Sequence, residues 1–134
     1  EPINHPLLGW RPVIPQETCV LIDCDTADEA HYLCALVGSA LVGFLVGAHS
    51  VAGGKGFGTP GILEFIRLRR FDPDCELHRE LATASRAAHA WAAREAEGGT
   101  PDALAEVQQE IDTAAAALWG LDSSEHQAIA RFMA

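Results

Sequence analysis

Basic residues are scarce in this chain of 134 residues: nine Lys and Arg stand against 19 Asp and Glu, which gives a net charge of −10. This balance excludes a nonspecific attraction of the whole chain to DNA or to an anionic membrane surface. The acidity is uneven, however. Residues 1–71 hold five Lys/Arg and seven Asp/Glu (net −2), whereas residues 72–134 hold four and twelve (net −8). The first half can therefore still carry a local basic patch.

The motifs of a self-contained enzyme are also missing. No C-x-x-C pair and no H-x-x-x-H spacing occurs among the four cysteines and six histidines, so no metal site is expected. No G-x-S-x-G elbow occurs, and the glycine-rich run GGKGFGT lacks the Gly-Lys-Ser/Thr ending of a P-loop. We therefore expect no catalytic residue in this chain, and we expect reduced thiols, as in a cytoplasmic protein.

The N-terminal region is interrupted by proline. Four prolines among residues 1–18 remove backbone donors, so this stretch is expected to be an irregular arm with Trp10 as a candidate core anchor. The run CVLIDCD, residues 19–25, is apolar and partly β-branched, which predicts a short strand.

An uncharged apolar stretch then extends from Tyr32 to Ala48. Thr26 offers an N-cap oxygen and Glu29 stands three residues later, so a capping box is expected to start a helix over about residues 27–48. A break into two pieces is expected at Gly38, because glycine weakens a helix interior. The glycines and the histidine flanks of this stretch argue against a membrane span, so no membrane partner is expected.

A glycine-rich loop and an arginine-rich segment follow. The loop GGKGFGTPG, residues 53–61, is either a flexible connector or a place where backbone amides approach a phosphate. In the next segment, arginines alternate with apolar residues except at the step from 69 to 70. Residues 67–71 therefore predict a strand with one buried face and one cationic face.

The second half of the chain is expected to be helical. Residues 75–97 and 100–119 carry apolar side chains at helical spacing and are joined by a short turn, which predicts an antiparallel hairpin about 30 Å long. Residues 126–133 predict a last short helix. The expected fold class is α+β and mostly helical, with short strands packed on a buried helix and the helical hairpin after them. We divide the chain into residues 1–72 and residues 73–134.

The remaining positive feature is a set of cations near the middle of the chain. Lys and Arg contact DNA phosphates, and Arg also reads guanine in the major groove. An ordinary solvated strand face is the alternative interpretation. If the set binds DNA, the contacting residues are Lys55, Arg67, Arg69 and Arg70, with His49 and Ser50 at the end of the apolar helix.

Several segments, taken in order, resemble a known family. They are DEAHYLCALVGSALVGFLV, HSVAGGKGFGTPG and GILEFIRLRRFDPD in the first half, and ELATASRAAHAW and LWGLDSSE in the second. The set resembles the target-recognition region and C-terminal helices of adenine-specific DNA methyltransferases of restriction-modification and phage-defence systems, including fused restriction-methylation enzymes. It also resembles half of a type I restriction specificity subunit.

The resemblance implies a non-catalytic specificity fragment. It implies that residues 20–71 contact double-stranded DNA and that the hairpin is a rod or docking surface. The catalytic Asn/Asp-Pro-Pro-Tyr/Phe motif and the S-adenosylmethionine site of that family lie in an upstream methyltransferase domain. We therefore expect this chain to be a piece of a longer protein, without a cofactor of its own. The alternative is a protein-interaction module whose acidic hairpin pairs with a partner or with a second copy in a homodimer.

Overall fold

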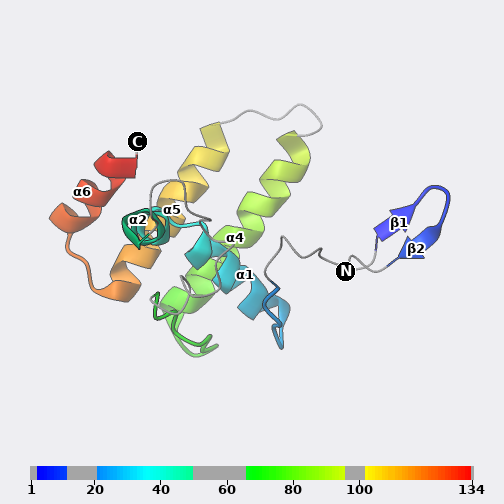
Figure 1. Cartoon of the computed structure of the whole chain (residues 1–134), viewed down its shortest axis with the longest axis horizontal. Helices are drawn as coiled ribbons and strands as arrows, with labels where there is room; N and C mark the ends of the chain where they lie inside the picture. Colours follow the sequence, from blue (N-terminus) through cyan, green and yellow to red (C-terminus); the bar gives the residue numbers. More distant parts are fainter. Residues whose placement is uncertain (1–2, 12–20, 50–65, 96–101, 134) are drawn as a thin grey trace.

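The computed structural model describes residues 3–11, 21–49, 66–95 and 102–133, which are mostly helical (Figure 1). This confirms the predicted α+β class dominated by helices. In chain order the elements are β1 (Ile3–His5), β2 (Gly9–Arg11), α1 (Ala27–Val37), α2 (Ala40–His49), α4 (Glu76–Glu95), α5 (Asp102–Trp119) and α6 (Ser123–Met133).

The two strands lie at a different place from the predicted ones. β1 and β2 pair antiparallel, with Asn4 opposite Trp10, and Gly9 has a positive φ of 67° beside the turn. Trp10 is 69% exposed, so the prediction of an irregular arm anchored in the core by this residue is wrong. Figure 1 shows the β1–β2 hairpin standing apart from the helices. Residues 21–24, the described part of the strand predicted over 19–25, have no strand structure.

The predicted capping box starts α1. Glu29 N donates to Thr26 Oγ1 (3.1 Å), and the Glu29 carboxylate accepts in return from Asp25 N (2.8 Å), one residue earlier than the standard motif. α1 ends at Gly38, and α1 and α2 meet at a bend of 58°. The predicted break of the apolar stretch is therefore confirmed.

α5 holds this bend in place. Ser39 Oγ accepts from Val42 N (3.3 Å), and Asp112 Oδ1 accepts from Ala40 N (2.7 Å) at the first turn of α2. A carboxylate is favourable there because the unpaired amides at a helix start carry partial positive charge. Gln108 Nε2 donates to the carbonyl of the residue where α1 ends (3.2 Å). Two side chains of α5 therefore fix the direction in which α2 leaves α1.

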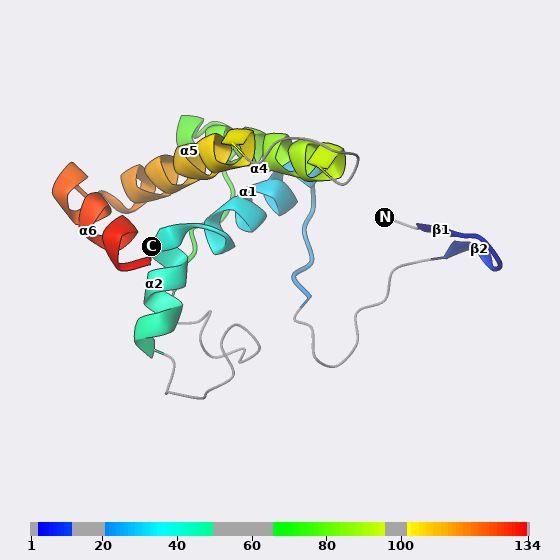
Figure 2. The same ribbon diagram turned by 90° about the horizontal axis from the view of Figure 1, so that it is seen from above.

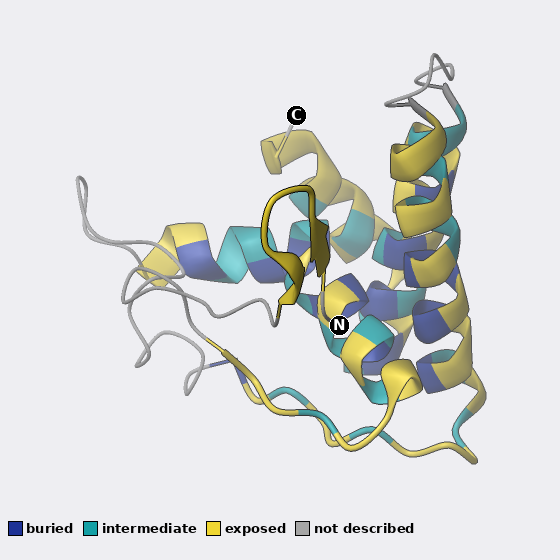
Figure 3. Ribbon diagram, turned by 90° about the vertical axis from the view of Figure 1, so that its right-hand side faces the viewer, coloured by how far each residue is buried: buried dark blue, intermediate teal, exposed yellow. Residues whose placement is uncertain are grey.

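The core lies where α1 packs on the antiparallel pair α4 and α5. Figure 2 shows α4 and α5 in one layer with α1 against one side of it, and Figure 3 shows the buried residues gathered where the helices meet. This core crosses the boundary drawn at residue 72, because α1 supplies part of it. Its buried members are Tyr32, Ala35 and Leu36 of α1, Leu81, Ala82 and Ala84 of α4, and Val107, Ile111, Ala115 and Leu118 of α5.

A second, smaller cluster lies under α2. Val42, Val46 and Ile66 are buried together there. α6 covers another side of α2, where the Phe44 and Phe132 rings meet edge to face at 5.2 Å. No single helix in the described ranges is long and apolar enough to cross a membrane, although α1 and α2 reach that length and composition as a bent pair.

Candidate nucleic-acid interface

The predicted cationic face lies on the short segment that leads into α4. Ile66 is buried in the small cluster under α2, and Leu68 packs against both clusters. Phe71 packs against the larger one. The side chains between these apolar anchors point outward and are exposed: Arg67, Arg69 and Arg70. The structure therefore brings three of the predicted residues together on one outer surface.

This segment is not a strand, so that part of the prediction is wrong. Residues 67–70 have no β pairing within the described parts of the chain, and Leu68 N donates to Ile66 O (2.5 Å) in the three-residue pattern of a γ-turn. The alternation of exposure survives without a sheet. Apolar side chains here are buried against helices, and the arginines between them remain in solvent.

Two buried side chains fix the backbone of the arginine segment. The Tyr32 hydroxyl donates to Arg69 O (2.9 Å), and Asp72 N donates to His78 Nδ1 (2.9 Å). Because His78 Nδ1 accepts, the proton of a neutral imidazole lies on Nε2, which is 3.5 Å from the Tyr32 oxygen. One chain of contacts thus links α1 to the residues on both sides of Arg70.

The same two side chains form an aromatic cluster under the segment. Tyr32 lies 4.5 Å from the His78 ring and 5.5 Å from the Phe71 ring, measured between centroids. Burial, followed by the negative charge that Cys75 would carry, raises the pKa of Tyr32 to about 12, against a smaller lowering effect of Arg69. The phenol is therefore neutral near pH 7 and available as a donor to the backbone.

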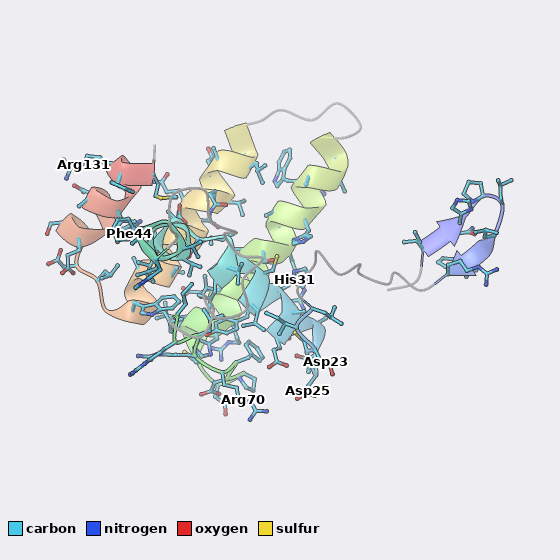
Figure 4. All side chains as sticks on the ribbon, in the orientation of Figure 1. Asp23, Asp25, His31, Phe44, Arg70 and Arg131 are labelled. Carbon is cyan, nitrogen blue, oxygen red and sulfur yellow. The ribbon has the colours of Figure 1, made fainter. Side chains whose placement is uncertain are left out.

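The remaining predicted contact residues lie elsewhere. His49 is the last residue of α2 and is exposed, which matches its expected position at a helix end. Lys55 and Ser50 fall outside the described residues. Figure 4 shows Arg70 at the outer edge of its segment, directed away from the helices.

The charge around the arginines is only weakly positive. Asp72 and Asp74 follow directly, so residues 66–74 carry three cations and two carboxylates. The Asp72 carboxylate already accepts from Asp74 N (2.9 Å) before α4 begins. Such a surface can neutralise a few phosphates, and it cannot act as a broad cationic platform.

A polar cluster between α1 and α4 was not predicted. His31 Nδ1 lies 3.1 Å from Ser85 Oγ, and His89 Nδ1 donates to Ser85 O (2.8 Å). Burial, then the charges of Arg86 and His89, lower the pKa of His31 against the smaller opposite effect of Asp28. The sequence signal is weak, because 54 residues separate His31 from Ser85.

This cluster is a helix–helix contact and lacks the features of a catalytic centre. Ser85 is only 2% exposed, so its hydroxyl cannot reach a substrate. An ion pair between Arg86 and Asp28 joins the same two helices at the surface. Cys24, the other reactive type of side chain nearby in sequence, has a thiol pKa raised by burial and then by Glu29 and the flanking aspartates. The described ranges contain no group of three or more His, Cys, Asp or Glu placed to hold a metal ion.

Comparison with family models, with curated proteins and with solved structures gives no match for this chain.

Proposed function

We propose that this chain is a DNA target-recognition fragment of an adenine-specific DNA methyltransferase or of a fused restriction-modification enzyme. The observation that carries the proposal is the exposure of Arg67, Arg69 and Arg70 on one segment whose backbone is fixed from below. The ordered sequence resemblance described above supports the choice of family.

The chemistry of the segment suits DNA. A guanidinium presents several donors in a fixed plane, which matches a phosphate or the O6 and N7 atoms of guanine. A backbone held by Tyr32 and His78 reduces the conformational entropy that the arginine side chains lose on binding. The acidic half of the chain is unsuited to DNA, and we assign to it contacts with protein.

Catalysis and cofactor binding belong to other parts of the parent protein in this proposal. The upstream methyltransferase domain would hold S-adenosylmethionine and supply the catalytic motif. The present chain would supply sequence reading to that domain.

The proposal is tested by titrating a labelled DNA duplex with the chain at several salt concentrations. If three arginines contact phosphates, log K falls against log[salt] with a slope of about −2.7, since each neutralised phosphate contributes about 0.9. The variant with Arg67, Arg69 and Arg70 all changed to Ala should bind more weakly and lose most of this slope.

A matched control removes the same charge elsewhere. The variant Arg79→Ala, Arg94→Ala and Arg131→Ala also lowers the net charge by three, but on α4 and α6. It should retain more affinity and more slope than the first variant. Absence of binding at low salt, or an equal loss in both variants with unchanged circular dichroism, would contradict the proposal.

A further inference from the structure

A groove lies along the α4–α5 hairpin on the side opposite α1. Its α4 wall is formed by Glu76, Glu80, Thr83, Ala84 and Ala87, with Arg79 beside them, and its α5 wall by Glu110 and Ala114. In an α-helix, residues spaced at i, i+4, i+7, i+8 and i+11 share one face. The α4 residues that face α1 belong to the other face of the helix, which includes Ala82 and Ser85.

The floor of this groove consists of small side chains. Ala84 is buried, and Ala87 and Ala114 are partly buried against the core. Small residues at a helix–helix contact let the axes approach to about 8 Å, the lower end of the usual range. α1 already packs on α4 in this manner, over Ala82 and Ser85. The shape of the groove therefore suits a second helix more than it suits a compact small molecule.

The rim of the groove carries unneutralised negative charge. Glu76, Glu80 and Glu110 are exposed, and none of them forms an ion pair within the described parts of the chain. The nearby cation, Arg79, donates through Nη1 to Pro73 O (2.7 Å) and makes no ion pair with these carboxylates. An occupant that brings Lys or Arg to the rim would gain three new charge pairs.

We infer that this groove binds a basic amphipathic helix of a partner protein, with the apolar stripe of that helix on the alanine floor and its cations against the three glutamates. A second copy of this chain is disfavoured, because residues 72–134 carry a net charge of −8 and the two rims would repel each other. This inference is independent of the proposed DNA contact, which uses a different surface.

The test uses two synthetic helix-forming peptides with identical leucines at i, i+3, i+4 and i+7. One peptide has lysines at all other positions facing outward, and the other has glutamates there. Fluorescence anisotropy of the labelled peptides with the 134-residue chain gives their affinities. We expect binding of the lysine peptide that weakens with salt, and no measurable binding of the glutamate peptide.

Two charge-matched variants then locate the site. Glu80→Lys with Glu110→Lys changes the rim, whereas Asp23→Lys with Asp25→Lys makes the same change of charge before α1. The rim variant should lower the affinity for the lysine peptide by about tenfold or more, and the control variant should change it much less. A third variant, Ala87→Gln, fills the floor without changing charge and should also weaken binding.

The opposite results are equally clear. Equal losses in the two charge variants would mean that only the overall charge attracts the peptide, and the inference would be wrong. Binding of the glutamate peptide, or no binding of the lysine peptide to the folded chain, would also overturn it. A doubled mass in sedimentation that the rim variant converts to a monomer would assign the groove to a second copy instead.

Discussion

Replacement of Tyr32 by phenylalanine tests how the arginine segment is held. The change removes one oxygen from a side chain that is 0% exposed and keeps the ring that packs on Phe71 and His78. The variant loses the hydrogen bond to Arg69 O and leaves His78 Nε2–H without its nearest acceptor. The packing of the core stays almost the same.

The size of the effect follows from burial. The Arg69 residue is exposed, so water can replace the lost phenol at its carbonyl, but His78 is only 4% exposed and its N–H stays unpaired. A buried donor left without a partner costs about 1–3 kcal/mol, and we take about 2 kcal/mol. With an unfolding entropy of about 2.1 cal/mol/K per residue, a chain of 134 residues should lose about 7 °C in Tm.

Two measurements check this expectation. Denaturant unfolding should show a lower midpoint with an unchanged m-value, because the fold and its buried surface are preserved. Limited trypsin digestion should show faster cleavage after Arg69 and Arg70, since local opening of this segment becomes easier. Mass spectrometry of the early fragments identifies the cleaved bonds.

Thr113→Val is the matched control. It also removes one hydroxyl, but this group donates to Gln109 O on the exposed side of α5. Its effect should stay within about 0.5 kcal/mol. If Tyr32→Phe were as mild as this control and left the trypsin pattern unchanged, the hydroxyl would not hold the segment, and the account of the clamp would be wrong.

Three other changes have expected outcomes. Asp112→Ala should lower the free energy of unfolding by about 1 kcal/mol through loss of the α2 cap, whereas Asp112→Asn keeps an acceptor; urea denaturation of both checks this. The pKa of His31 lies below its ordinary value of 6.5, so its contribution is complete above pH 6.5 and is lost as the pH falls through its lower folded pKa; stability measured against pH in His31→Phe should lack this acid loss. The pKa of Asp122 is lowered by its hydrogen bonds to the Ser124 hydroxyl and the Glu125 amide, so Asp122→Ala should fray α6 at neutral pH, with a smaller difference from the parent chain at acid pH, as read by helical circular dichroism.

Helix ends were predictable because their signals are local. Thr26 and Glu29 lie three residues apart and bond as the motif predicts, with the return bond shifted to Asp25. Asp122 and Glu125 form the reciprocal pair at the start of α6, with both bonds at 2.9 Å. Such contacts need only a few neighbouring residues, so composition and spacing are enough to find them.

Strands were not predictable in the same way. Residues 21–24 are partly apolar and β-branched, yet they form no strand, and the pairing occurs over residues 3–11 in spite of the prolines nearby. A strand exists only if a partner strand meets its backbone groups, and the sequence does not say where that partner lies. The segment before α4 shows the same limit, since its exposure pattern was predicted and its pairing was not.

The sequence by itself determined the helical class, the approximate helix boundaries, the break at Gly38 and the outward direction of the three arginines, because periodicity and capping act over a few residues. Only the tertiary structure decided that Tyr32 and His78, 46 residues apart, lie under that segment and fix its backbone. It also decided that one face of the α4–α5 pair is covered by α1 while the other stays open as an acidic groove. Contacts over such separations depend on how whole helices pack, and no local pattern of residues specifies that.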